Sequence, residues 1–272
     1  MCYSKEVQLL TASIILLSCL FYYVYFKLKF SQYNKKPWLI PFLNHTVLAF
    51  VLIGIHQLFE FLTLVTGNQV IYKLGLLSSI SVMYFALRSF EILTNKKIYS
   101  KLSLILIAAV TIHLFLVPLS FAEKFFYVQH QSTFFWGAAW LVLFTYWHIC
   151  AWQQRKELKD DNSKKMITIY LLAGTDIAFI LSVIYSVFGS LYFGVNYCYD
   201  SPSIWCTFMV IQALFVPLFL SSLPNLFNRP KSPSTLTLKQ LLVYLIISLL
   251  IVTLIALTLP LFDCFTWKFV FP

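Results

Sequence analysis

The part of the chain that most constrains its fold is residues 44–64, NHTVLAFVLIGIHQLFEFLTL. This stretch is long enough to cross a lipid bilayer, since a spanning helix needs about 20 mostly apolar residues. It nevertheless contains two histidines and a glutamate. At about 100° per residue, four of its polar side chains share one stripe of a helix: His45, His56, Glu60 and Thr63. Because ionisable groups are costly in lipid, we expect this stripe to face the interior of a helix bundle.

The composition of the whole chain favours lipid as its environment. Hydrophobic residues make up 60% of the 272 residues, charged residues make up 11%, and the mean hydropathy is +0.80. Soluble domains carry about 25% charged residues. Aromatic residues reach 18%, which suits lipid-facing surfaces and interfacial belts. The net charge of +10 lies in short loops rather than on a soluble domain, so binding to nucleic acid is not expected.

Eight apolar runs of suitable length follow one another along the chain. They are residues 8–26, 38–66, 70–93, 102–121, 132–153, 166–194, 203–226 and 239–262. The backbone finds no hydrogen-bond partner in lipid, so each run is expected to be helical. The connections between the runs are too short to hold a soluble domain. The sequence therefore predicts an all-α, polytopic bundle of about eight spans, forming one integral-membrane domain over residues 1–272.

The lysines and arginines predict how this bundle is oriented. Fifteen of them lie in the loops after the first, third, fifth and seventh runs, four lie on the opposite side, and Arg88 lies within the third run. The positive-inside rule then places the basic loops in the cytoplasm and both termini outside. The expected location is the inner (plasma) membrane of a bacterium.

This topology brings four of the six cysteines to the outer face: Cys2, Cys198, Cys206 and Cys264. That face is oxidising, so at least one disulfide is expected, although more than one pairing is open. A bridge between Cys2 and Cys206 would attach the N-terminus to the seventh run and leave Cys198 with Cys264. Thiolates also bind soft metals, but the CxxC spacing that would indicate such a site is missing.

A group of polar residues near the outer face forms the candidate site. His56 and Glu60 lie one helical turn apart, so Glu60 can accept a hydrogen bond from His56 and set its tautomer. This spacing suits a pair of metal ligands, a general acid and base, or a purely structural link between helices. The residues expected to converge there are Cys2, Tyr3, Ser4, His56, Glu60, Trp205, Cys206 and Gln212.

A second polar group is expected toward the cytoplasmic side of the bundle. Its members are Arg88, Glu91, His148 and Asp176. Arg88 and Glu91 are one turn apart on the third run, and Asp176 is the natural neutralising partner of Arg88 if their helices meet. We interpret this group first as an ion pair between helices.

Three short stretches resemble an uncharacterised family of bacterial multi-span membrane proteins. They are MCYS at 1–4, HQLFEF at 56–61 and SIWC at 203–206. Proteins of that family begin Met-Cys-aromatic-Ser, carry Gln-x-x-Glu on the second helix and open a late helix with Trp-Cys. Here His56 and Phe61 stand where the family often has Gln and Gly. The resemblance implies that Cys2, Glu60 and Cys206 belong together, and it implies no activity.

These patterns are compatible with three functions. The preferred expectation is a polar pocket near the outer face that binds or transports a small molecule or a lipid. An intramembrane enzyme, metal-dependent in one form, would use His56 and Glu60, although the chain contains no HExxH or GxSxG motif. A structural membrane subunit would use its polar residues only to hold helices together. The sequence leaves the cofactor unknown, and apart from the outer cysteines the metal ligands that it suggests are His56 and Glu60.

Overall fold

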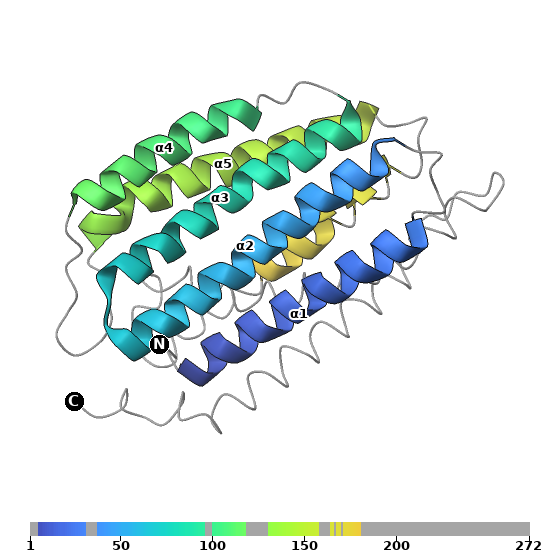
Figure 1. Ribbon diagram of the computed structural model, residues 1–272. Coiled ribbons are helices and arrows are strands. Elements are labelled where there is room, and N and C mark those ends of the chain that lie inside the picture. Colours follow the sequence, from blue (N-terminus) through green and yellow to red (C-terminus); the bar gives the residue numbers. More distant parts are fainter. Residues whose placement is uncertain are drawn as a thin grey trace. The chain divides into compact units, whose positions relative to one another are not determined.

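The computed structural model describes residues 5–30, 37–95, 100–117, 130–157, 164–165, 167–169 and 171–180, and every element among them is a helix (Figure 1). The elements are α1 (Lys5–Phe30), α2 (Leu39–Thr66), α3 (Gln69–Thr94), α4 (Ser100–Leu116) and α5 (His130–Glu157). Residues 164–180 are also helical where the structure describes them. The all-α class predicted from the sequence is confirmed for these residues.

The first five apolar runs of the sequence overlap α1 to α5, one run to each helix, and the end of the fourth run, at 118–121, lies outside the described residues. Two of these helices, over Leu39–Thr63 and Gln69–Thr94, are long and apolar enough to cross a membrane. The sixth run begins in helical residues, whereas its remainder and the seventh and eighth runs lie outside the described residues. The number of spans and their orientation therefore stay predictions.

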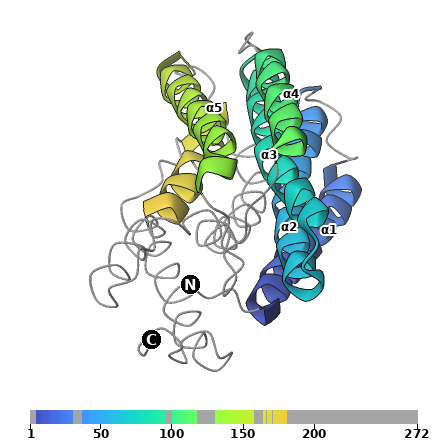
Figure 2. The ribbon, with the colours of Figure 1, turned by 90° about the vertical axis from the view of Figure 1, so that its left-hand side faces the viewer.

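The chain divides into two units, Gln8–Lys156 and Met1–Val7 with Glu157–Pro272. In the first unit, α1 and α2 lie side by side and run in opposite directions, as do α2 and α3 (Figures 1 and 2). In the second unit, the hydroxyls of Thr168 and Thr175 donate to backbone carbonyls one turn earlier in the helix.

A two-residue turn reverses the chain between α2 and α3. Gly67 adopts a left-handed conformation with φ 67°, which glycine reaches without a steric penalty, and its N–H donates to Thr63 O at 2.7 Å. Asn68 follows as the N-cap of α3, and its side-chain oxygen accepts from the N–H of Val70 at 2.8 Å. This short turn makes α2 and α3 antiparallel neighbours.

Two glycines let α2 approach the helices on either side of it. A Cβ atom at Gly54 would lie 2.7 Å from Leu16 Cγ of α1. A Cβ atom at Gly75 of α3 would lie 3.2 Å from Phe59 Cβ of α2. Small residues at such contacts let helix backbones come close, as they do in membrane helix bundles. The contact at Gly75 places the α3 backbone directly beside His56.

The α3–α4 pair is tied together at both ends. At one end, the buried Lys73 of α3 donates from Nζ to the carbonyl of Val117, just beyond the last turn of α4, at 3.1 Å. At the other end, Glu91 of α3 accepts the backbone N–H of Ser100 at 2.9 Å and the Ser100 hydroxyl at 2.7 Å. Each charged side chain complements the helix terminus that it contacts.

We expect Lys73→Met to lower the free energy of unfolding by about 1 kcal/mol, because it removes a hydrogen bond and a positive charge from the C-terminus of α4. Lys101→Met is the matched control, since Lys101 is exposed on α4. The free energy would be measured from denaturant unfolding of the protein in detergent. Equal losses in the two variants would contradict this role of Lys73.

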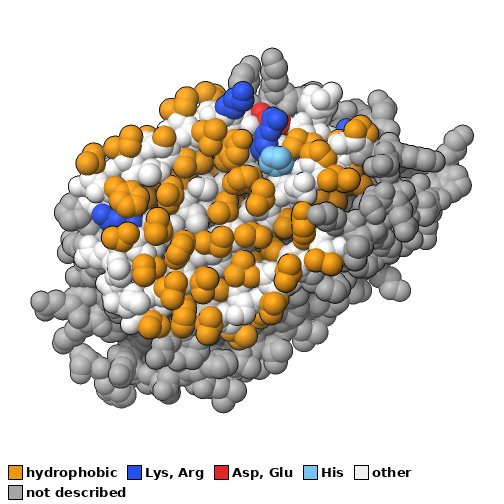
Figure 3. Space-filling model, in the orientation of Figure 1, with side chains coloured by type: hydrophobic (Ala, Val, Ile, Leu, Met, Phe, Trp, Pro, Cys, Tyr) orange, Lys and Arg blue, Asp and Glu red, His pale blue; other side chains and the backbone are white. Residues whose placement is uncertain are grey.

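Large apolar side chains are exposed over much of the first unit. Leu116 of α4 is 77% exposed, Ile105 of α4 is 67% exposed, and Leu17 of α1 is 65% exposed. Figure 3 shows such side chains spread across one face of the molecule, with Lys, Arg and His near its margins. Soluble monomers rarely expose contiguous apolar patches beyond a few hundred Å².

Candidate functional site

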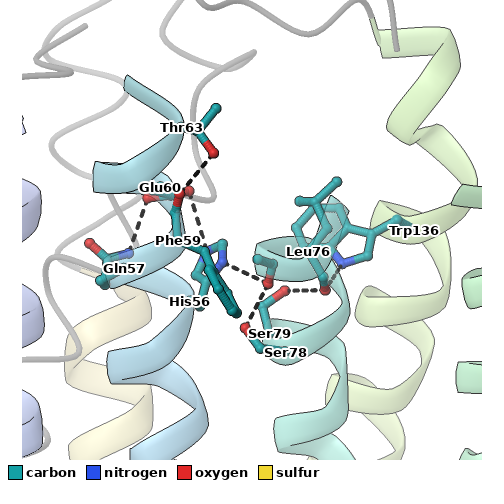
Figure 4. Close-up of polar contacts among 10 residues, drawn as sticks. His56, Gln57, Phe59, Glu60, Thr63, Leu76, Ser78, Ser79 and Trp136 are labelled. Carbon is teal, nitrogen blue, oxygen red and sulfur yellow. Dashed lines mark hydrogen bonds and ion pairs between the residues drawn. The ribbon is translucent and has the colours of Figure 1, made fainter. Parts of the chain in front are cut away.

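The described part of the candidate site centres on His56, which α2 directs toward α3. The imidazole is 1% exposed, and its Nδ1 lies 2.9 Å from the carbonyl oxygen of Gly75 (Figure 4). A carbonyl oxygen can only accept, so Nδ1 carries the hydrogen and donates it. The close approach at Gly75 brings this carbonyl within reach. The contact therefore fixes the ring of His56 and leaves Nε2 directed at the next turn of α2.

Glu60 occupies that next turn and lies between His56 and Gln57 (Figure 4). Its Oε1 is 3.3 Å from Nε2 of His56, and its Oε2 accepts from Nε2 of Gln57 at 3.3 Å. The one-turn spacing in the sequence predicts that His56 and Glu60 meet, and they do. All three side chains are buried. We call His56, Gln57 and Glu60 the α2 polar group.

The tautomer of His56 decides which atom its ring presents to Glu60. With the hydrogen of the neutral ring on Nδ1, Nε2 presents a lone pair toward Oε1.

The rest of the predicted stripe on α2 behaves differently at its two ends. Thr63 is buried and donates from Oγ1 to the carbonyl of Phe59 at 2.8 Å. His45 is only half-buried; its Nδ1 is bonded to the carbonyl of Pro41 at 2.8 Å, and its ring packs near Phe85. His45 thus contributes to the N-terminal half of α2 and is separate from the α2 polar group.

The other residues expected at the outer site lie outside the described residues. They are Cys2, Tyr3, Ser4, Trp205, Cys206 and Gln212, together with Cys198 and Cys264 of the expected disulfides. Their convergence with His56 and Glu60, and the cysteine pairing, stay predictions. The two cysteines that are described, Cys19 and Cys150, are buried and free.

Three members of the inner polar group make local contacts within the first unit. Arg88 Nη1 pairs with Glu91 Oε2 at 2.5 Å on α3, and Glu91 also binds Ser100 at the start of α4. His148 is bonded through Nδ1 to the carbonyl of Phe144 at 3.0 Å on α5. Asp176 belongs to the second unit, so its pairing with Arg88 stays a prediction.

Two buried contacts near His56 are absent from the sequence-based site. Gln57 is the Gln of the Gln-x-x-Glu element in the family resemblance, but it lies about 100° away from His56 around the helix and so falls off the predicted polar stripe. Trp136 of α5 donates from Nε1 to the carbonyl of Leu76 at 2.9 Å, one residue beyond Gly75. That bond joins a side chain to a backbone carbonyl 60 residues away in the sequence. The apolar pattern of α5 does not distinguish Trp136 from the other aromatic residues of that helix.

Within the described part of the chain, no three His, Cys, Asp or Glu side chains come together in a group that could hold a metal ion. Comparisons of the sequence and structure with family models, curated proteins and solved structures find no match. The chemistry of the α2 polar group is therefore the basis on which a function can be assigned.

Proposed function

We propose that this chain is an integral membrane protein whose helix bundle binds or transports a small molecule or a lipid at the α2 polar group. In this proposal the group lies in the outward half of α2 in a bacterial inner membrane, with the basic loops in the cytoplasm. Cys2, Ser4, Trp205, Cys206 and Gln212 would complete the site from the N-terminus and the seventh apolar run.

The surface of the first unit supports the membrane environment. Leucine, isoleucine and phenylalanine side chains are exposed along α4, and similar residues are exposed on the other helices. The described charges of α3 lie toward its ends, at Lys73, Arg88 and Glu91. In water, such a surface would favour aggregation, whereas in a bilayer it would face lipid tails.

The observation that favours ligand binding is the incomplete hydrogen bonding of the α2 polar group. Among the described residues, Gln57 Oε1 is buried and has no hydrogen-bond partner, and the buried His56 Nε2 has only its 3.3 Å ion-pair contact with Glu60. A buried polar group without a partner costs about 1–3 kcal/mol. The Glu91 carboxylate, in contrast, is bonded through both oxygens and links two helices. A structural role explains Glu91 but leaves the unpartnered Gln57 Oε1 unexplained.

The test is native mass spectrometry of the full chain purified from membranes, comparing the wild type with Glu60→Gln and with His45→Gln as the matched control on the same helix. We expect a small molecule or lipid to remain bound to the wild type and to His45→Gln, and to be lost from Glu60→Gln. The fold of each variant would be checked by circular dichroism. Identical bound species in all three proteins would contradict ligand binding at Glu60.

A further inference from the structure

Arg88 is a charged side chain that lies within an apolar run and is only half-buried. Its side chain is 43% exposed, less than two turns before the end of α3, a helix long and apolar enough to cross a membrane. A charge exposed to hydrocarbon is costly, so an arginine near the end of a span extends toward the headgroups and the anions there. In the proposed topology, the end of α3 and the start of α4 lie on the cytoplasmic side.

The ion pair with Glu91 uses only one nitrogen of the Arg88 guanidinium. Nη1 pairs with Glu91 Oε2 at 2.5 Å, and among the described residues Nη2 and Nε of Arg88 have no hydrogen-bond partner. A guanidinium carries five N–H donors. Glu91 is also committed to α4, because it accepts from the N–H and the hydroxyl of Ser100. Arg88 therefore keeps donors for a second anionic acceptor.

Lys101 adds another positive charge beside this ion pair. Arg88 and the Ser100 hydroxyl contact the same oxygen of Glu91, and Lys101 directly follows Ser100 at the start of α4. Lys101 is exposed and makes no hydrogen bond or ion pair with the described residues. Two cationic side chains thus stand against one carboxylate, and the N-terminus of α4 adds a partial positive charge. We call Arg88 and Lys101 the basic pair.

The surface next to the basic pair is apolar. Leu102 of α4 is 59% exposed, and Ile105, one turn beyond Lys101, is exposed as well. Figure 3 shows basic, acidic and His side chains close together at the upper margin of a face that is otherwise covered by hydrophobic side chains. A free anion would contact only the basic pair. A phospholipid would contact the basic pair with its headgroup and the apolar side chains with its acyl chains.

We propose that the basic pair binds the headgroup of an acidic phospholipid, whose acyl chains lie on the exposed apolar side chains of α4. The free donors of Arg88 suit the phosphodiester oxygens, and Lys101 supplies a point charge. A zwitterionic lipid has the same phosphodiester but brings its own cation toward Lys101, so an acidic headgroup such as phosphatidylglycerol fits better. This inference rests on the membrane environment of the proposed function and is independent of ligand binding at the α2 polar group.

The experiment places the full chain in nanodiscs of phosphatidylcholine with a minor fraction of phosphatidylglycerol and counts the lipids retained in native mass spectra. We expect the wild type to retain phosphatidylglycerol in preference to phosphatidylcholine. Arg88→Gln and Lys101→Gln should each lower this preference about fivefold. Lys165→Gln, which removes the same charge from the second unit, should leave it unchanged, as should Glu60→Gln. Lys101 has no polar contact to lose, so Lys101→Gln tests the site if Arg88→Gln does not fold.

Equal retention of the two lipids by the wild type would overturn the inference. An equal loss of phosphatidylglycerol in Lys165→Gln would also overturn it, since any basic side chain would then serve. Displacement of the retained lipid by an equimolar amount of glycerophosphoglycerol, the headgroup without acyl chains, would overturn the assignment to a lipid. Loss of phosphatidylglycerol in Glu60→Gln alone would place the lipid at the α2 polar group, which would overturn this inference and support the proposed function.

Discussion

Gly75→Leu is expected to lower the free energy of unfolding by about 3 kcal/mol, the largest effect of any single change at the α2–α3 contact. A Cβ atom at this position would lie 3.2 Å from Phe59 Cβ and 3.5 Å from His56 Nδ1. A leucine side chain adds volume where α2 and α3 are already in contact. The two helices would have to separate, and the bond between His56 and the Gly75 carbonyl would lengthen or break.

Gly137→Leu is the matched control for that substitution. Gly137 lies on α5, and a Cβ atom there would have no heavy atom within 4 Å other than those of its local backbone. Leucine favours helix over glycine by about 0.5–1 kcal/mol, so this variant should be unchanged or slightly more stable. Both variants would be unfolded by denaturant in the same detergent, with tryptophan fluorescence as the signal. Equal destabilisation would show that the two glycines pack alike.

Glu91→Ala is expected to lower the free energy of unfolding by about 2 kcal/mol and to fray the first turn of α4. The substitution removes the acceptor of both the Ser100 N–H and the Ser100 hydroxyl, which together act as an N-terminal cap supplied by another helix. It also leaves Arg88 without its carboxylate, at a modest cost because the Arg88 side chain is 43% exposed.

Hydrogen exchange measured by mass spectrometry distinguishes local fraying caused by loss of this cap from a general loss of stability. We expect faster exchange in the first turn of α4 in Glu91→Ala, with exchange in the Gly67–Asn68 turn unchanged. Glu91→Gln keeps an oxygen that can accept from Ser100 and should recover part of the protection. Unchanged exchange at the start of α4 in Glu91→Ala would show that Ser100 is capped in another way.

Local spacing along the chain is sufficient to predict part of the candidate site. His56 and Glu60 are four residues apart, and Arg88 and Glu91 are three apart, so a helix places the members of each pair on one face. The length of the apolar runs likewise predicts the five helices, because an uninterrupted apolar run of about 20 residues has few other stable forms in lipid. These inferences need only the geometry of one helix.

The remaining contacts depend on how neighbouring helices are rotated and aligned. His56 bonds to a backbone carbonyl of α3, Lys73 to a carbonyl at the end of α4, and Glu91 to the first residue of α4. Backbone carbonyls carry no sequence signal, so a partner of this kind cannot be recognised in advance. The close approach at Gly75 brings its carbonyl to His56.

Gln57 shows most clearly the difference between what the sequence predicts and what helix packing decides. By itself the sequence determines that Gln57 lies on α2 beside the His56–Glu60 stripe, where an amide could equally face lipid, solvent or protein. Its burial follows from the tertiary structure, because α1 packs on α2 at Gly54, three residues earlier on a similar face of the helix. Sequence periodicity thus sets which side chains share a helix, whereas helix packing decides which of them lose water and which keep an open hydrogen bond.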